Sequence, residues 1–297
     1  MNFLAKISII GSGIVGTIVG KGFDKIEYDV IFYDISKERI EQLKKEGFDA
    51  TTNMDYAISN SGVSFISVPT PTVNNKIDLS IMKSATEEMA KSLKNKKDYH
   101  LFIVKSTVVP NTTEDVIKPI LEKFSGKKCG PGFGLCMNPE FLTEIHKSWT
   151  NDPSQVRDFF TEDRIVIGSF DKKSGDTLEK LYKKLKIPIF RTNLKTAELI
   201  KYTSNCCLAS RVSYWNEIFY VCNRLGVDSN LVAEIVSMDK RVGKYGTIHG
   251  MAYGGKCFPK DIKAFIAFAE SIGHDPIFMK SVDKINEQIK KDKGVRE

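Results

Sequence analysis

The segment IIGSGIVG, from Ile9 to Gly16, decides the fold that this sequence predicts. It carries Gly11, Gly13 and Gly16 in the spacing G-x-G-x-x-G, directly after the apolar run KISII and at the start of a stretch with helical periodicity. In such a strand–turn–helix unit the first glycine permits a tight turn, the second lets the backbone approach a pyrophosphate, and the third lets helix and strand pack closely. The alternative interpretation of these glycines is a tight turn in some other α/β fold.

The acidic residue Asp34 favours the dinucleotide interpretation. It ends VIFYD, the second apolar run of the chain, at about the twenty-residue distance from the glycines that the dinucleotide fold uses. An acid at this place accepts hydrogen bonds from a ribose 2′-hydroxyl, and it repels a 2′-phosphate. The sequence therefore predicts a site for NAD rather than NADP. An ordinary aspartate at a strand end is the simpler alternative.

The first part of the chain alternates short β-branched runs with amphipathic stretches, as doubly wound α/β domains do. The strands expected in its parallel sheet are KISIIG, DVIFYD, VSFISVP, HLFIVKST, GLCMNPE and RIVIG. From Leu194 to Gly226 the pattern changes to one long helix without proline. We therefore predict an α/β fold, with a Rossmann-type doubly wound parallel sheet in residues 1–192 and an all-helical domain with one long central helix in residues 193–297.

Polar residues follow three of the expected strands at the points where the strands end. Ligands of open parallel sheets bind outside these carboxyl ends, so three such turns in succession predict the rim of a pocket. Each residue taken alone is more simply an ordinary helix cap. The residues are Pro69 and Thr70 after one strand, Ser106 and Thr107 after the next, and Asn138, Glu140 and Glu144 after the third.

Lys201 and Asn205 lie four residues apart in the long helix, and therefore on one face of it. Apolar residues on neighbouring turns, Ala197, Ile200 and Leu208, predict that this face is largely buried. A solvated polar pair is the simpler interpretation. A buried lysine without a partner is costly, however, so the pattern favours a functional role.

The composition argues against several classes of protein. The 297 residues carry a formal net charge of +7, but the lysines are spread along the chain, which disfavours nucleic acid as a partner. The six cysteines form no C-x-x-C pair and have no histidine spacing suited to zinc, so we expect no metal and a reducing cytoplasm. No apolar run approaches the ~18 residues of a membrane span, and the N-terminus lacks the features of a signal peptide.

The order of these motifs resembles that of the UDP-glucose/GDP-mannose dehydrogenase family. The matching blocks are GSGIVG, VPTPT, KSTVVPNTTE, NPEFLTE, DRIVIG, AELIKYTSN and YGGKCFPKD. Many enzymes share the glycine pattern, whereas the cysteine block and the lysine–asparagine helix are specific. The resemblance implies an NAD-dependent enzyme that removes four electrons from the C6 alcohol of a nucleotide sugar, most closely UDP-glucose, and so makes a carboxylate.

The resemblance assigns the covalent chemistry to Cys257. Its thiolate would add to the aldehyde formed by a first hydride transfer, and the resulting thiohemiacetal would lose a second hydride to become a thioester that water hydrolyses. Pro259, expected as the first residue of a helix, would place the sulfur at a helix N-terminus, where a thiolate is favoured. Lys201 and Asn205 match residues that stabilise the developing oxyanion.

The resemblance implies further roles for polar residues near the strand ends. Asp261 and Thr107 match residues that hold a catalytic water, and Asp261 also assists removal of the alcohol proton. Glu140 matches the base proposed for thioester hydrolysis. The cofactor-binding residues expected are Gly11, Gly13, Gly16, Asp34, Pro69, Thr70, Thr107 and Glu144, and the substrate-binding residues expected are Glu140, Glu144, Lys201, Asn205, Arg241, Gly254 and Cys257.

The family continues into a third, nucleotide-binding domain, whereas this chain stops at Glu297. We therefore expect a minimal enzyme without that domain, acting as a homodimer through the long helix 194–225. Two other hypotheses stay open. One is a two-electron dehydrogenase of the hydroxyacid type, which needs no cysteine nucleophile. The other is a truncated, non-catalytic or split-enzyme partner that binds NAD.

Overall fold

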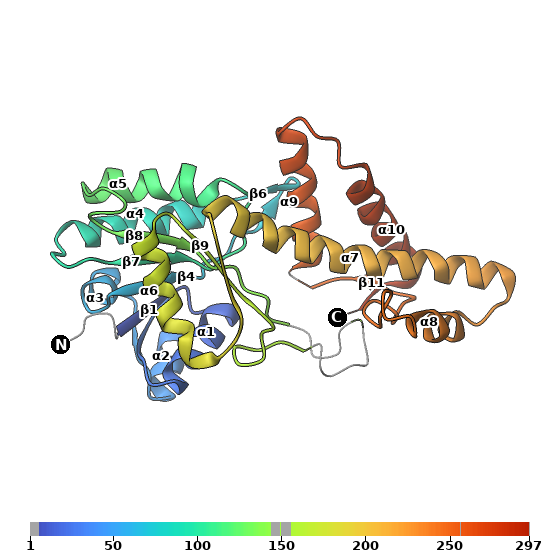
Figure 1. Ribbon diagram of the computed structural model, residues 1–297, viewed down its shortest axis with the longest axis horizontal. Coiled ribbons are helices and arrows are strands. Elements are labelled where there is room, and N and C mark those ends of the chain that lie inside the picture. Colours follow the sequence, from blue (N-terminus) through green and yellow to red (C-terminus); the bar gives the residue numbers. More distant parts are fainter. Residues whose placement is uncertain (1–5, 144–148, 150–155, 256, 297) are drawn as a thin grey trace. The chain divides into compact units, whose positions relative to one another are not determined.

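The computed structural model describes residues 6–143, 149, 156–255 and 257–296, and the chain forms two compact units (Figure 1). The first unit contains the chain up to Pro71, residues 78–142 and residues 157–201. The second contains residues 72–77, residues 143–156 and the chain from Tyr202 onward. The compact units divide within the long helix, whereas the predicted domain boundary, between residues 192 and 193, lies just before it. The assignment of separate roles to two domains stays a prediction.

The first unit is built on an eight-stranded sheet with the strand order β10-β9-β8-β7-β4-β1-β2-β3. β1 lies between β2 and β4 and is parallel to both, since Ile7 pairs with Val30 on one side and with Val63 on the other. The strand order therefore reverses beside β1, which confirms the predicted doubly wound, Rossmann-type arrangement. The strands are β1 (Lys6–Ile10), β2 (Asp29–Tyr33), β3 (Asp49–Thr51), β4 (Val63–Ile66), β7 (Leu101–Val104), β8 (Gly134–Met137), β9 (Ile165–Ser169) and β10 (Ile189–Thr192).

The direction of β9 differs from the prediction. The run RIVIG was expected in a parallel sheet, but β9 is antiparallel to β8, with Cys136 opposite Ser169, and β10 is parallel to β9. Parallel neighbours need a crossover connection, usually a helix, while antiparallel neighbours do not. In its described part, the connection between β8 and β9 contains no helix. The two last strands of the sheet therefore run against the other six.

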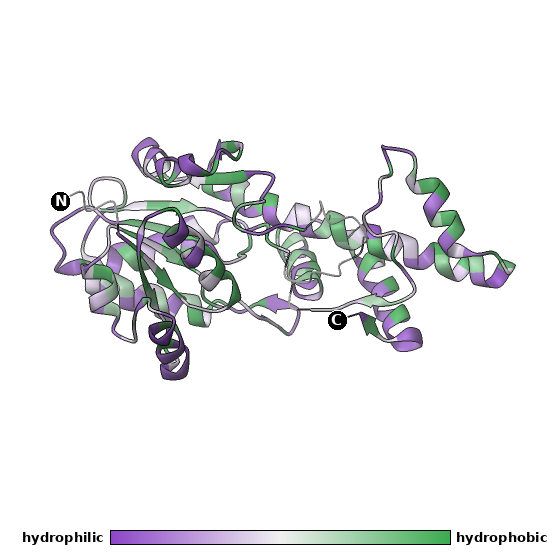
Figure 2. Ribbon diagram, turned by 90° about the horizontal axis from the view of Figure 1, so that it is seen from below, coloured by the Kyte–Doolittle hydropathy of each residue, from purple (hydrophilic) through white to green (hydrophobic). Residues whose placement is uncertain are grey.

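Helices enclose the sheet of the first unit, and its strands other than the edge strands β3 and β10 are mostly buried. In Figure 2 the strands are mostly hydrophobic, while the helices alternate between hydrophobic and hydrophilic residues. Phe23 of the first helix packs against Phe65, Phe159 and Tyr182 and joins three parts of the core. The helices are α1 (Ile14–Lys25), α2 (Lys37–Lys45), α3 (Met54–Ser59), α4 (Ser80–Lys94), the π-helix η2 (Thr113–Ile117) with α5 (Lys118–Ser125), and α6 (Lys172–Tyr182) with the 3-10 turn η4 (Lys183–Leu185).

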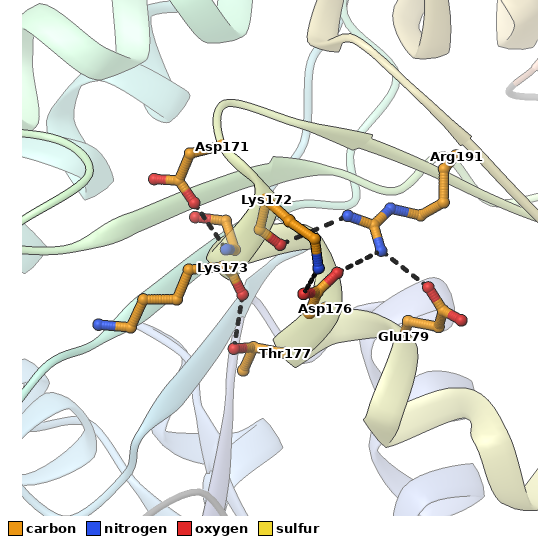
Figure 3. A network of polar contacts seen from close by, with 8 residues as sticks. Asp171, Lys172, Lys173, Asp176, Thr177, Glu179 and Arg191 are labelled. Carbon is orange, nitrogen blue, oxygen red and sulfur yellow. Dashed lines mark hydrogen bonds and ion pairs between the residues drawn. The ribbon is translucent and has the colours of Figure 1, made fainter.

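Arg191 joins the edge strand β10 to α6 through a network of polar contacts (Figure 3). Its Nη1 donates to Asp176 Oδ1 at 3.0 Å and to Glu179 Oε2 at 2.7 Å. The guanidinium lies beside Gly175, where an added Cβ would come within 1.8 Å of Nη2. Asp171 caps the same helix turn through its side chain. Glycine at position 175 therefore leaves the space that these ion pairs occupy.

The second unit is mainly helical and has two small sheets. β5 (Thr72–Val73) and β6 (Lys76–Ile77) form a hairpin, and β11 (Ala252–Tyr253) pairs in parallel with β12 (Val295–Arg296). These sheets add to the all-helical domain that the sequence predicts. The helices are the part of α7 (Leu194–Leu225) that follows Lys201, α8 (Ser229–Ser237), α9 (Phe258–Ser271) and α10 (Ile277–Lys293). None of the helices in the described residues is long and apolar enough to cross a membrane.

The long helix α7 confirms the prediction for residues 194–225. It ends at Gly226, whose φ of 66° is a left-handed conformation that glycine adopts without strain. The backbone N–H of Val227 then donates to the carbonyl of Cys222 at 3.0 Å, which satisfies one of the last carbonyls of the helix. In the second unit α7 packs through Ala209 and Val212 into a core that includes residues of α9 and α10.

Candidate active site

The glycine loop after β1 has the geometry that a dinucleotide requires. Gly11 has a φ of 93°, and an added Cβ would lie 2.8 Å from the carbonyl oxygen of Ser67. A Cβ on Gly16 would come within 2.0 Å of the Gly11 carbonyl oxygen. At Gly13, the N-cap of α1, an added Cβ would meet none of the described atoms within 4 Å. The loop is therefore tight at its two ends and open where a pyrophosphate would approach.

Asp34 follows β2 and is held beside this loop. Its Oδ2 accepts a hydrogen bond from the backbone N–H of Ser12 at 2.8 Å, and its Oδ1 accepts one from Ser36 at 3.0 Å. Arg39 binds the same loop, because its Nε donates to the carbonyl of Ser12 at 2.7 Å and its Nη2 donates to Thr17 Oγ1 at 3.0 Å. The predicted ribose-binding acid thus has a fixed position at the carboxyl end of β2.

The loops after β4 and β7 are fastened to each other. Thr70 Oγ1 donates to the carbonyl of Thr107 at 2.7 Å, and Ser106 Oγ donates to the carbonyl of Val68 at 2.7 Å. Pro69 and Thr70 therefore lie beside Thr107, as the sequence predicts for a rim at the strand ends. Their contact with a cofactor stays a prediction.

The turn after β8 carries a buried ion pair. Glu140 Oε1 lies 3.0 Å from Lys201 Nζ, and the two side chains are 9% and 4% exposed. Burial raises the pKa of Glu140, but the charge and hydrogen bond of Lys201, with the backbone N–H of Leu142 and the charge of Lys105, outweigh it and lower the pKa below its usual value. Two residues with separate predicted roles are thus bonded to each other. A carboxylate with a lowered pKa is ionised, as a general base must be.

A second buried polar pair lies in the second unit. Asn205 Nδ2 donates to Asp261 Oδ2 at 2.6 Å, and Lys260 Nζ lies 2.6 Å from Asp261 Oδ1. Asn205 and Asp261 are both buried, and so is Lys201 on the preceding turn of α7, which confirms the predicted burial of this helix face. Both oxygens of Asp261 have partners, so the carboxylate is fixed in a position to hold a water or accept a proton.

Cys257 is the N-cap of α9. Its carbonyl accepts the backbone N–H of Asp261 at 2.9 Å, and the residue is half-buried. Phe258 is the first helical residue and Pro259 the second, one position later than predicted. Proline still fits, because the N–H of the second helical residue has no partner within the helix. The sulfur thus belongs to the residue at the helix N-terminus, where thiolate is favoured.

The remaining predicted residues have different surroundings. An added Cβ on Gly254 would come within 2.2 Å of Val295 Cγ1, so packing against β12 accounts for this glycine. Arg241 is 90% exposed and binds the Asp239 carboxylate at 2.6 Å. Glu144 lies outside the described residues. The substrate contacts of these three stay predictions. Among the described residues, no group of three His, Cys, Asp or Glu side chains is arranged to hold a metal ion.

Two family models match the chain. The NAD binding domain of the UDP-glucose/GDP-mannose dehydrogenase family matches residues 46–186, and the central domain of that family matches residues 195–288. The chain belongs to the UDP-glucose/GDP-mannose dehydrogenase family. The family expected from the motifs is thereby confirmed, and NAD is its cofactor.

Known dehydrogenases of this family match nearly the whole length of the chain. A UDP-glucose 6-dehydrogenase from Haloferax volcanii is 36% identical, and the match covers 95% of this chain and 69% of the relative. A GDP-mannose 6-dehydrogenase from Pseudomonas syringae pv. tomato is 35% identical, and the match covers 95% of this chain and 68% of that enzyme. The solved structure of a UDP-glucose dehydrogenase from Pyrobaculum islandicum matches with a TM-score of 0.87 and 32% identity. The match covers 96% of this chain and 68% of the chain in that structure.

The sequence analysis did not identify Glu198, a buried glutamate that lies three residues before Lys201 on α7. Its Oε2 accepts the backbone N–H of Asn111 and its Oε1 that of Thr113, each at 2.7 Å. It therefore caps the helix that η2 begins, and it ties the segment after Thr107 to the turn of α7 that precedes Lys201. The only signal in the sequence is an acid among apolar residues of a long helix, which charged helix faces share.

Glu198 predicts a pH dependence of stability. Burial raises its pKa to about 7, against the lowering effect of its hydrogen bonds to Thr113 and Asn111. The folded protein therefore binds this proton more tightly than the unfolded chain, whose glutamate has the ordinary pKa of 4.5. The resulting stability, about 3 kcal/mol, is present below pH ~4.5 and is lost as pH rises through about 7.

Urea unfolding between pH 4.5 and pH 8 measures this contribution. Glu198→Gln should remove the part of the slope that Glu198 causes, and Glu114→Gln, a half-exposed glutamate of η2, should keep it. An unchanged slope in the Glu198 variant would show that the carboxyl titrates normally.

Asp34 predicts the cofactor preference. Asp34→Ala removes the expected acceptor of the ribose hydroxyls and the negative charge that would repel a 2′-phosphate, so we expect NAD to bind about 10- to 100-fold more weakly and NADP discrimination to relax. Calorimetric titration with both cofactors measures this. Asp29→Ala, at the exposed opposite end of β2, is the matched control. Equal affinities of the Asp34 variant and the parent protein for both cofactors would remove Asp34 from the site.

Proposed function

We propose that the protein is an NAD-dependent nucleotide-sugar 6-dehydrogenase that oxidises the C6 alcohol of UDP-glucose to the carboxylate of UDP-glucuronate. The observation that carries the proposal is the pair of buried contacts made from one helix, Lys201 with Glu140 and Asn205 with Asp261. A buried ammonium and an amide donor suit an oxyanion, and two fixed carboxylates suit proton transfer. The family and its UDP-glucose-oxidising relative support the same chemistry.

The proposed reaction uses the chain's own groups in order. NAD, when bound, would supply the hydride acceptor, with one NAD molecule for each of the two oxidations. In the first, Asp261, with a water that Thr107 helps to hold, takes the proton of the C6 alcohol, and Lys201 and Asn205 stabilise the oxygen as charge develops. The Cys257 thiolate then forms a C–S bond to the aldehyde carbon, and the thiohemiacetal loses its hydride to become a thioester.

Hydrolysis completes the proposed reaction. Glu140 takes a proton from water, whose oxygen attacks the thioester carbonyl, and the C–S bond breaks to return the Cys257 thiolate. Four electrons leave the sugar in two hydrides, and one water enters the product. Thr70, which fastens the Thr107 loop, and Pro69 would line the cofactor side. Glu144, Arg241 and Gly254 are proposed to lie beside the sugar nucleotide.

NADH formation by the purified chain tests this proposal. With UDP-glucose in limiting amount, two NADH should form per sugar. GDP-mannose, assayed in the same way, should react more slowly. One NADH per sugar would instead support the two-electron alternative. Cofactor binding without turnover on any nucleotide sugar would support the non-catalytic or split-enzyme alternative.

We also propose that the protein is a homodimer in the cytoplasm. The second half of α7, the following α8 and the residue that ends α8 expose a series of apolar side chains, which an interface would bury: Tyr214, Val221, Leu225, Leu231, Ile235 and Met238. A nucleophilic Cys257 also needs a compartment that keeps thiols reduced. Sedimentation equilibrium should give a mass twice the chain mass of 33.4 kDa. The Leu225→Asp variant should have the mass of the monomer. A monomeric parent protein would contradict the dimer.

A further inference from the structure

Lys201 has two tasks under the proposed function. At rest its Nζ lies 3.0 Å from Glu140 Oε1, and during the oxidations the same ammonium has to face the oxygen of the sugar. Both side chains are buried. A buried carboxylate that loses its only counter-charge either takes up a proton or destabilises the protein by several kcal/mol. Glu140 would then reach the hydrolysis step as a poorer base.

A second buried lysine holds the turn that carries Glu140. Lys105 directly follows β7 and is 3% exposed. Its Nζ donates to Asn138 Oδ1 at 3.0 Å and to the carbonyl of Pro139 at 3.4 Å, the two residues that precede Glu140. Asn138 Oδ1 also accepts the hydroxyl of Tyr182 at 2.6 Å. Lys105 is thus fixed by its partners near the turn.

Asn138 makes this arrangement rigid. Besides the two hydrogen bonds that its Oδ1 accepts, its Nδ2 donates to the carbonyl of Val166 at 2.8 Å, and its backbone N–H donates to the carbonyl of Val104 at 2.9 Å. The turn is therefore tied to β7 on one side and to β9 on the other. A cation bonded to such a turn stays in place while the Lys201 side chain moves.

We propose that Lys105 is a fixed counter-charge for the Glu140 carboxylate, a positioning residue that lets Lys201 leave Glu140 and turn to the substrate. The proposal rests on the proposed function for the roles of Lys201 and Glu140. It adds a residue that touches neither the sugar nor the cofactor and acts through Glu140.

The other charges around Glu140 are consistent with this role. Burial raises the pKa of Glu162, and although the charge of Lys105 and the backbone N–H of Phe141 act to lower it, the pKa stays above its usual value. Glu162 therefore holds its proton to higher pH than an ordinary glutamate and competes less for the charge of Lys105. Arg164 lies over the Phe141 ring at 4.0 Å, and its Nη1 lies 2.6 Å from Asp163 Oδ1. Burial lowers the pKa of Lys105, but the charges of Glu162 and Glu140 act to raise it. Lys201 and Lys105 are the cations that lower the pKa of Glu140.

Carboxyl carbon NMR titration of the NAD-bound protein tests the proposal without turnover. The Glu140 signal is assigned by its loss in Glu140→Gln. Lys105→Met should move its midpoint to higher pH. Lys105→Gln removes the charge but keeps an N–H donor for Asn138, and it should also move the Glu140 midpoint to higher pH. This variant replaces Lys105→Met if the methionine variant does not fold. Lys96→Met is the matched control, because Lys96 is also a buried lysine of the first unit and its Nζ donates to the carbonyl of Ile58.

Variants of Lys201 separate the two cations. In Lys201→Met, which imitates the departure of Lys201, Glu140 should stay ionised at neutral pH, and adding Lys105→Met should leave it protonated there. In single-turnover kinetics, Lys105→Met should slow thioester hydrolysis by roughly tenfold at neutral pH and leave the first hydride transfer unchanged. A Glu140 midpoint that neither Lys105 variant moves would overturn the inference. Absence of sugar oxidation would overturn the proposed function, and the titration would still decide the role of Lys105.

Discussion

Cys257→Ser should lower the rate of sugar acid formation by a factor on the order of a thousand or more. A serine hydroxyl at the N-terminus of α9 stays protonated at neutral pH, so it adds to an aldehyde far more weakly than a thiolate does. The second oxidation needs the thiohemiacetal, and without it the sugar stops at the aldehyde level. Slow formation of at most one NADH per sugar should remain.

Product stoichiometry, with trapping of the aldehyde by an amine reagent, measures this result. The matched control is Cys207→Ser, because Cys207 is an exposed thiol of the same chain on α7. That variant should form two NADH per sugar, and NAD affinity should stay the same in both variants. Acid formation by Cys257→Ser at the parent rate would show that the thiol is not the nucleophile of the second oxidation.

Local signals made two parts of the fold predictable from the sequence. The glycine spacing at residues 11–16 and the acid at position 34 describe one strand–turn–helix–strand unit, and each feature depends on neighbours close in the chain. The long helix could be predicted for the same reason, down to its end at Gly226. The direction of β9 could not, because the run Ile165–Ser169 has the same apolar pattern in a parallel and in an antiparallel strand. Its pairing with β8 decides the direction.

The residue types of the site were predictable, but their partners were not. Lys201 and Glu140 are 61 residues apart in the chain, and Asn205 and Asp261 are 56 residues apart, so no spacing rule connects them. Lys105 escaped notice because one lysine among 44 basic residues carries no signal until its burial is known. The sequence thus predicts which residues carry the chemistry. The packing of the strand-end turn after β8 showed which groups hold it.

Glu140→Gln should stop the reaction after the second hydride transfer. The amide keeps the size and one oxygen of the carboxylate but cannot take a proton from water, so hydrolysis of the thioester should slow by about 10²- to 10⁴-fold. The first turnover should still release two NADH for each active site, because neither oxidation uses Glu140 as a base. A burst of two NADH followed by a stall is therefore the expected time course.

Intact-protein mass spectrometry of the stalled Glu140→Gln variant should find the sugar nucleotide attached to Cys257. Removing the carboxylate also removes the buried ion pair between Glu140 and Lys201, so urea unfolding is needed to show that the variant is folded under assay conditions. Glu162→Gln is the matched control, since Glu162 is the neighbouring, partly buried carboxyl that interacts with the same two lysines. If the control variant stalls with the adduct and Glu140→Gln turns over normally, the base is Glu162. If neither variant stalls, another group activates the water, and the lowered pKa of Glu140 reflects an ion pair that is structural.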